Sequence, residues 1–235
     1  MLDNTVSMRG KLIVLDGADG AGKDTQADRL LAHAKGRGIS AAIIRFPAYE
    51  QTFSGKEVRA YQSGRFGELI NCHPKLISYL YAVDRFEMQS QLHELLNTHE
   101  LVIAARYVIS NIAYQAARLP KEERPAFRTW AETLDYEVLH NPREDAVIFL
   151  SLPTALSDQL IAKRQQETEG ARDIHDENAR YREEVLGEYE TLCASHDHWF
   201  SIQCNDGDQI RSIEDIATEL DRLVFERVLA TVETA

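Results

Sequence analysis

The chain has 235 residues, of which 44% are hydrophobic, and its net charge is −12. This length suits one domain with a sizeable core, and the composition argues against a disordered chain. An acidic surface disfavours nonspecific binding of nucleic acid, and no apolar run reaches the ~20 residues that a membrane helix needs. Three widely spaced cysteines favour a reduced, cytoplasmic protein, and the polar residues 1–10 predict a flexible start.

Short apolar runs alternate with longer amphipathic segments along the chain. We expect five buried strands, at residues 12–15, 41–46, 101–104, 146–152 and 199–203. Helices are predicted at residues 25–35, 74–97, 110–118, 121–139, 154–167, 177–195 and 210–230. Near-continuous apolar strands are typical of a parallel sheet that is covered on both faces. The pattern predicts a three-layer α/β domain over residues 11–235, with ligands at the carboxyl ends of the strands.

The first expected strand runs into the glycine-rich sequence Gly17-Ala-Asp-Gly-Ala-Gly-Lys-Asp-Thr25. Its spacing matches the G-x-x-x-x-G-K pattern of a phosphate-binding loop, in which main-chain N–H groups surround phosphate oxygens. The helix that follows adds partial positive charge, and Lys23 adds a mobile cation. Asp24 replaces the usual Ser or Thr, whose hydroxyl would bind Mg²⁺. The predicted nucleotide-binding residues are Gly17, Ala18, Asp19, Gly20, Ala21, Gly22, Lys23, Asp24 and Thr25.

Two polar stretches allow more than one interpretation. Residues 164–178 are almost wholly polar, so they form either a solvated helix end with salt bridges or a lid whose arginines reach phosphates. Cys193, His196 and His198 could form part of a metal site, but no second ligand pair accompanies them. A polar helix end is the preferred interpretation of this second stretch.

Several landmarks occur in order along residues 11–223. They are the glycine-rich loop with Asp19, Phe46-Pro47, Tyr81-x-x-Asp84-Arg85, Arg106-Tyr107-x-x-Ser110-Asn111-x-x-Tyr114-Gln115, the arginine-bearing polar segment and Tyr189. Together they resemble the thymidylate kinases, which are P-loop nucleoside monophosphate kinases that phosphorylate dTMP. The resemblance implies a P-loop NTPase fold with a five-stranded parallel sheet and a short mobile lid at about residues 164–178. It also implies ATP and Mg²⁺ as cofactors, nucleotides as partners and a homodimer.

The resemblance assigns a role to each matching residue. Phosphoryl transfer would depend on Lys23, Arg106, Arg164 and Arg172. The acceptor would contact Asp19, Phe46, Pro47, Tyr49, Tyr81, Arg85, Arg106, Ser110, Asn111 and Tyr114. Within that set, Tyr81 would stack on thymine, Arg85 would address the 4-keto oxygen, and Tyr114 would crowd the ribose 2′ position. Arg106 would clamp the acceptor phosphate, and Asp19 would lie near the 3′-hydroxyl.

Each assignment has a structural alternative. Tyr81 could be a core aromatic, and Arg85 could form a helix-surface salt bridge beside Asp84 and Glu87. Ser110 could simply cap the helix that follows the third strand. Arg106 could be an ordinary exposed arginine.

Three positions depart from the family pattern, and all are expected near the phosphates. Asp24 replaces the metal-binding hydroxyl, Ala105 replaces the aspartate before Arg106, and Ala48 stands where many members have an arginine. One carboxylate is lost at Ala105 and one is gained at Asp24, so we expect Asp24 to be the metal ligand. Two alternatives stay open: a kinase for another monophosphate such as dUMP, and a catalytically weak nucleotide-binding protein of the same fold.

Overall fold

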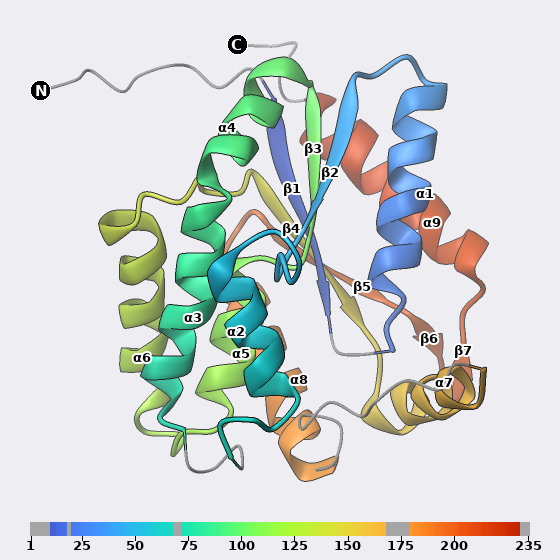
Figure 1. Ribbon diagram of the computed structural model, residues 1–235. Helices are drawn as coiled ribbons and strands as arrows, with labels where there is room; N and C mark the ends of the chain where they lie inside the picture. Colours follow the sequence, from blue (N-terminus) through green and yellow to red (C-terminus); the bar gives the residue numbers. More distant parts are fainter. Residues whose placement is uncertain (1–9, 18–19, 68–71, 168–178, 231–235) are drawn as a thin grey trace, which may run out of the picture.

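The computed structural model describes residues 10–17, 20–67, 72–167 and 179–230. One parallel sheet forms its centre, in the order β2-β3-β1-β4-β5 (Figure 1). Its strands are β1 (Lys11–Gly17), β2 (Ala41–Arg45), β3 (Leu101–Ala105), β4 (Ala146–Ser151) and β5 (Trp199–Gln203). The predicted α/β architecture with five parallel strands is therefore confirmed.

Helices cover both faces of this sheet (Figure 1). On one face lie α1 (Lys23–Gly36), α9 (Ile213–Arg222) and the π-helical segment η3 (Leu223–Val228). On the other face lie α3 (Pro74–Glu87), α4 (Gln89–Thr98), α5 (Val108–Ala116), α6 (Arg124–Glu132) and α8 (Ala179–Ala194). α2 (Phe53–Gln62) packs against α3, and α7 (Thr154–Glu167) follows β4. No helix within the described ranges combines the length and apolar character of a membrane span.

Strand β1 shows why the sheet needs cover on both sides. Its residues alternate between the two apolar clusters, with Leu12 and Val14 in one and Ile13 and Leu15 in the other. All four side chains are buried, and each contributes about 1.5–3 kcal/mol by leaving water. This double burial produces the continuous apolar runs that predicted a parallel sheet.

Several helix boundaries differ from the sequence prediction. The expected helix at residues 74–97 is two helices, because α3 ends at Glu87, where the N–H of Met88 bonds to both Asp84 O and Arg85 O. The expected helix at residues 121–139 starts at Arg124 and continues as the π-helical η2 (Thr133–Val138). The short α2 and the hairpin of β6 (Asn205–Asp206) and β7 (Gln209–Ile210) were not predicted from the sequence. Elements this short carry little periodicity.

The histidines that a metal site would have used, His196 and His198, lie just before β5. The His196 ring stacks on Trp199, with centroids 3.9 Å apart, and its Nε2 lies 3.5 Å from a Glu132 oxygen. Cys193 packs against the core instead. No group of three His, Cys, Asp or Glu residues in the described ranges is placed to hold a metal ion.

Candidate functional site

The glycine-rich loop begins where β1 approaches β4 closely. A Cβ atom at Gly17 would lie 2.6 Å from the Leu150 carbonyl oxygen, so only glycine fits there. Gly20 and Gly22 have φ values of 83° and 79°, in the region that glycine adopts without strain. Gly22 caps the N-terminus of α1, and Lys23 is the first, buried residue of that helix. The loop therefore presents a helix N-terminus at the carboxyl edge of the sheet, as predicted, although Ala18 and Asp19 lie outside the described residues.

A buried carboxylate, Asp16, ties the start of this loop to two helices. It accepts hydrogen bonds from the Ser110 hydroxyl of α5 at 2.6 and 2.7 Å and from the Tyr189 hydroxyl of α8 at 2.9 Å. It also accepts one from the Gly17 N–H at 2.8 Å. Ser110 therefore does not cap α5, whose cap residue, Tyr107, makes no side-chain cap bond. The sequence signal for this network was an acidic residue inside an otherwise apolar strand.

Tyr189 should stabilise the fold through its hydroxyl. Burial raises the pKa of Tyr189 well above its ordinary value, so the hydroxyl stays a donor to Asp16 at neutral pH. Tyr189→Phe keeps the ring that stacks on Phe149 at 4.8 Å but removes this bond. We expect the free energy of unfolding, measured by urea titration, to fall by about 1.5–3 kcal/mol, as for a bond to a charged group.

Tyr181→Phe is the matched control for this prediction. The Tyr181 hydroxyl donates to the neutral main-chain oxygen of Tyr114 at 2.7 Å, so its loss should cost only about 0.5–1.5 kcal/mol. If the two variants lost the same free energy of unfolding, the bond to Asp16 would contribute no more than a bond to a neutral acceptor.

Arg106 lies beside the glycine-rich loop because β3 and β1 are neighbours in the sheet. Its N–H donates to the Leu15 carbonyl oxygen at 3.0 Å, one residue before Asp16. Its φ of 65° is unusual for a residue other than glycine, and such conformations cluster at functional sites. The guanidinium carbon lies 5.8 Å from the centre of the half-buried Tyr114 ring. Arg106 is half-buried, so the alternative of an ordinary exposed arginine is wrong.

The loop after β2 is held in place by a second buried carboxylate, Asp84. This residue accepts the N–H of Ala48 at 2.9 Å and the hydroxyl of Thr52, and burial raises its pKa. Phe46 and Pro47, joined by a cis peptide bond, are both buried, and the Phe46 ring lies 5.5 Å from that of Tyr107.

Tyr49 lies in this loop and Tyr81 lies in α3, and both residues are half-buried. The Tyr49 ring lies 4.8 Å from the guanidinium carbon of Arg59. The Tyr81 hydroxyl accepts a bond from Gln62 at 3.4 Å, and its partial exposure does not fit a closed core position.

Arg85 forms a buried pair that was not predicted from the sequence. Its side chain is 2% exposed, and Nε and Nη2 each donate to an oxygen of Asp135 at 2.8 Å. Burial alone would lower the pKa of Arg85, but the Asp135 carboxylate raises it, so the charge is kept. A helix-surface salt bridge with Asp84 or Glu87 is therefore the wrong interpretation. The signal for Asp135 was an acid between the apolar Leu134 and Tyr136.

Buried polar atoms without partners lie where α3 and α5 pack together. Asn111 donates weakly to the Ser78 carbonyl oxygen at 3.5 Å, whereas its Oδ1 accepts no hydrogen bond from any residue that the structure describes. Ser78 Oγ and Gln115 Nε2 also lack partners in the described part of the chain, although both residues are fully buried. Leaving such atoms unpaired costs about 1–3 kcal/mol each.

A cavity of about 300 Å³ adjoins the glycine-rich loop on the α1 side. Its lining is Gly20, Ala21, Gly22, Thr25, Gln26, Leu152, Leu160, Cys204, Ile210, Arg211, Ile213 and Ile216. The sequence did not predict this cavity, because its walls come from four separate parts of the chain. The predicted phosphoryl-transfer arginines Arg164 and Arg172 are not part of this geometry, since the side chain of Arg164 and all of Arg172 lie outside the described residues.

Comparison with known proteins identifies the family. The thymidylate kinase family model matches residues 15–214, which is most of the chain. The chain belongs to the thymidylate kinase family. It is 29% identical over 184 residues to the thymidylate kinase of Mycobacterium tuberculosis, covering 78% of this chain and 86% of that protein. It is 28% identical over 231 residues to the Arabidopsis thaliana thymidylate kinase, covering 98% of this chain and 77% of the relative.

A solved structure supports the same fold. The thymidylate kinase of Candida albicans matches with a TM-score of 0.72 at 20% identity, covering 94% of this chain and 93% of that one. The expected three-layer arrangement of this kinase family is therefore confirmed for the chain.

The three departures from the family pattern have different surroundings. Ala48 and Ala105 are each 3% exposed, and their methyl side chains carry no group that could bind a phosphate or a metal ion. The Asp24 side chain is 70% exposed in the first turn of α1, with one oxygen 3.7 Å from Arg45 Nε. Arg45 also pairs with Asp28 at 2.5 Å, so its contact with Asp24 is the longer of the two.

Proposed function

We propose that the chain transfers the γ-phosphoryl group of ATP to dTMP, giving dTDP and ADP. The observation that carries this proposal is the placement of Arg106 beside the glycine-rich loop, through its bond to Leu15 at 3.0 Å. One element binds a polyphosphate, and the other supplies a fixed cation from the neighbouring strand. Two anions that repel each other in water can thus be held in line.

Phosphoryl transfer asks mainly for positioning and for positive charge where the transition state gathers negative charge. The N–H groups at the start of α1 and Lys23 would hold the donor phosphates. Arg106 would hold the acceptor phosphate against them. No covalent enzyme intermediate is needed. Arg164 and Arg172 remain predictions from the sequence, as do Asp19 near the sugar and a cytoplasmic location.

The acceptor base is proposed to lie between Phe46 and Tyr81, with Arg85 at its edge. Arginine carries only donors, so it favours the keto group of thymine or uracil over the amino group of cytosine. Asp135 engages Nε and Nη2 of Arg85 and would orient the rest of the guanidinium. Tyr114 would crowd the ribose 2′ position and favour deoxyribose.

The first turn of α1 has the oxygen donors that Mg²⁺ prefers, because Asp24 and Thr25 are both exposed there. Asp24 is the proposed ligand. A metal ion held there would supply positive charge close to the donor phosphates. Asp24 is the second residue of α1, so the helix fixes its position relative to the glycine-rich loop.

Asp24→Ala should weaken Mn²⁺ binding in the presence of ADP by about tenfold, measured by electron paramagnetic resonance. The loss of one charge-assisted contact to the ion is expected to lower its affinity by about this factor. Asp28→Ala is the control, because it removes the other carboxylate that pairs with Arg45 but lies one turn further along α1. Equal Mn²⁺ affinity for the natural chain and Asp24→Ala would refute the assignment.

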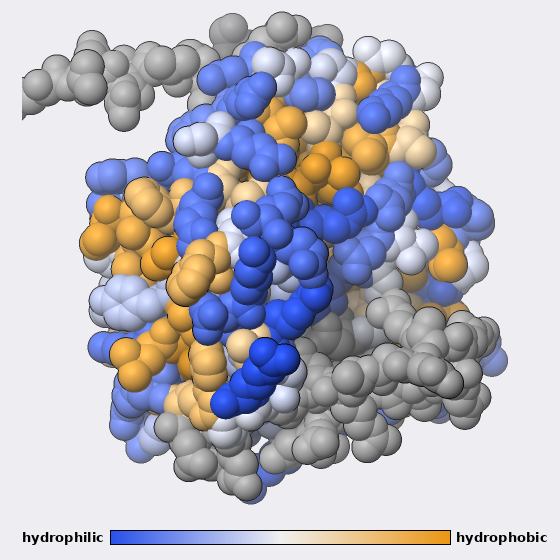
Figure 2. Space-filling view, viewed as in Figure 1, coloured by the Kyte–Doolittle hydropathy of each residue, from blue (hydrophilic) through white to orange (hydrophobic). Residues whose placement is uncertain are grey.

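A homodimer is proposed through the exposed apolar face of α3. Leu76, Tyr79 and Phe86 are 66%, 45% and 48% exposed, and Phe53 of α2 is 74% exposed. Figure 2 shows apolar side chains gathering on the side of the molecule where α3 and α6 lie. Leu76→Glu should convert a dimer into a monomer in sedimentation, whereas Ile213→Glu on the opposite face should not. A natural chain that sediments as a monomer would contradict the proposal.

The function is tested by steady-state ADP release with Mg²⁺–ATP and a panel of dTMP, dUMP, dCMP and dAMP. We expect dTMP to give the highest kcat/KM and dCMP to be poor. If another monophosphate gave a higher kcat/KM, that nucleotide would replace dTMP as the assigned substrate. Binding of dTMP without turnover would instead favour the weak nucleotide-binding protein that Ala48 and Ala105 suggest.

A further inference from the structure

The cavity beside the glycine-rich loop is mostly apolar, but one buried amide stands in its wall. The walls include Leu152, Ile210, Ile213 and Ile216, which suit the flat face of a base. Because Gly20 to Gly22 form one end of the cavity, a nucleotide with phosphates on the loop can place its base there. The cavity is therefore the candidate site for the base of the phosphate donor.

Gln26 in α1 is the amide in question, and its orientation is fixed. Its Nε2 donates to the carbonyl oxygen of Ile213, 3.0 Å away, at the start of α9. Only the NH₂ end of the amide can make that bond, so the other end is the acceptor Oε1. Within the described residues this oxygen has no hydrogen-bond partner, although Gln26 is only 2% exposed. A buried acceptor of this kind is unfavourable until a ligand supplies a donor.

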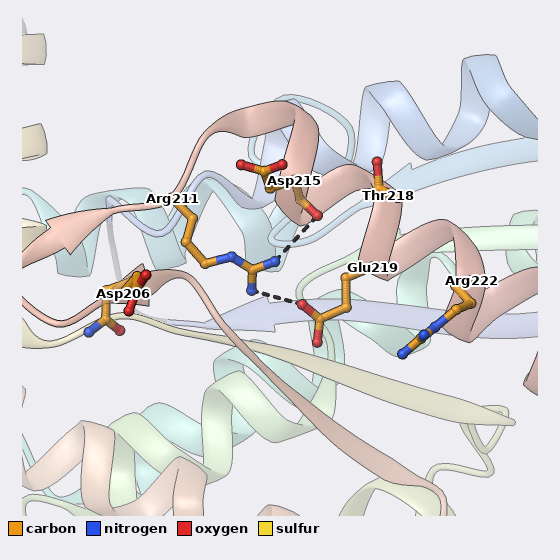
Figure 3. A pocket seen from close by; sticks show the side chains of 7 residues that line it. Asp206, Arg211, Asp215, Thr218, Glu219 and Arg222 are labelled. Carbon is orange, nitrogen blue, oxygen red and sulfur yellow. Dashed lines mark hydrogen bonds and ion pairs between the residues drawn. The ribbon is translucent and has the colours of Figure 1, made fainter.

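The other long polar side chain of the cavity wall is already engaged. Arg211 donates through Nη1 to Glu219 at 2.8 Å and to the Gln203 carbonyl oxygen, and through Nη2 to the Asp215 carbonyl oxygen at 3.4 Å. Figure 3 shows its guanidinium directed toward Glu219 and Asp215, in the polar groove beside α9. Gln26 is thus the buried side chain of this wall with an unfilled hydrogen-bonding position.

We propose that Gln26 determines which purine the donor site accepts. Its Oε1 accepts a hydrogen bond from the 6-amino group of adenine. A purine with a 6-keto group, such as hypoxanthine, would set two acceptors against each other and leave Oε1 unpaired. This assignment rests on the proposed function, because it takes the cavity as the donor-base site.

The test compares the affinities of ADP and IDP, with Mg²⁺ present and without dTMP, by calorimetry. The natural chain should bind ADP about tenfold more tightly than IDP, the size expected for one hydrogen bond at a buried site. Gln26→Met keeps the length of the side chain but removes the acceptor, so the ratio should fall to about twofold or less. Arg29→Met is the control, since Arg29 also joins α1 to α9, through Glu214, but does not line the cavity.

Three results would overturn the assignment: equal ADP and IDP affinities in the natural chain, an unchanged ratio in Gln26→Met, or an equal loss in Arg29→Met. The assignment would also be overturned if neither ADP nor IDP bound to the natural chain. Because the measurement needs no acceptor, selective ADP binding by a chain that does not phosphorylate dTMP would refute the proposed function and leave Gln26 assigned.

Discussion

Arg106→Met is expected to lower kcat/KM for dTMP by about 10²–10³-fold. Removing a preorganised hydrogen-bond donor that faces the charge of the transition state lowers the rate by this factor in other enzymes, because water cannot replace the donor within the site. The affinity for ADP should change little, since the glycine-rich loop binds the donor independently. Coupled ADP release for the rate and calorimetry for ADP would measure the two quantities.

Arg143→Met is a suitable control for this loss. Arg143 pairs with Glu137 at 2.6 Å, and both side chains are more than 60% exposed, away from the glycine-rich loop. Its removal should leave kcat/KM within about twofold, as for a solvated ion pair. An Arg106→Met variant as active as Arg143→Met would remove Arg106 from the mechanism.

Asp135→Leu is expected to lower the free energy of unfolding by about 3–5 kcal/mol. It would leave the guanidinium of Arg85 charged and unpaired in the core, which is the costly half of breaking a buried ion pair. The double change Arg85→Met with Asp135→Leu should recover most of this loss, because it removes both charges together. Urea unfolding of the two variants measures the difference.

The same pair of variants separates stability from recognition. The stable double variant should lose its preference for dTMP over dCMP, because no donor then faces the 4-position of the base. Glu137→Leu, which breaks the exposed pair with Arg143, should cost about 0–1 kcal/mol. If Asp135→Leu costs no more than Glu137→Leu, the Arg85 pair does not stabilise the core. If the double variant still prefers dTMP, Arg85 does not read the base.

The sequence predicted the features that depend on residues close together in the chain. The apolar runs of the five strands, the glycine-rich loop and Arg106 directly after β3 all depend on neighbouring residues. The fold and the edge of the sheet that carries the site could therefore be predicted from the order of residues alone. The family resemblance then supplied the candidate roles of Tyr81, Arg85 and Tyr114.

The missed features depend on contacts between distant residues. Arg85 and Asp135 are 50 residues apart, Asp16 and Tyr189 are 173 apart, and Gln26 contacts a carbonyl 187 residues away. A carboxylate in an apolar strand or helix marks a buried partner, but the chain does not say which partner. For that reason the structural alternative considered for Arg85 was a salt bridge beside its sequence neighbours Asp84 and Glu87, whereas the π-helical turn of η2 brings Asp135 to it.

Transfer of a labelled γ-phosphate is the most direct test that the glycine-rich loop and Arg106 bring two nucleotides together. ATP labelled in the γ-phosphate would be incubated with Mg²⁺ and dTMP, and the products separated. We expect the label in dTDP, one dTDP for each ADP formed, and none on the protein. Label released as inorganic phosphate, retained on the protein or left in ATP would contradict direct transfer between the two bound nucleotides.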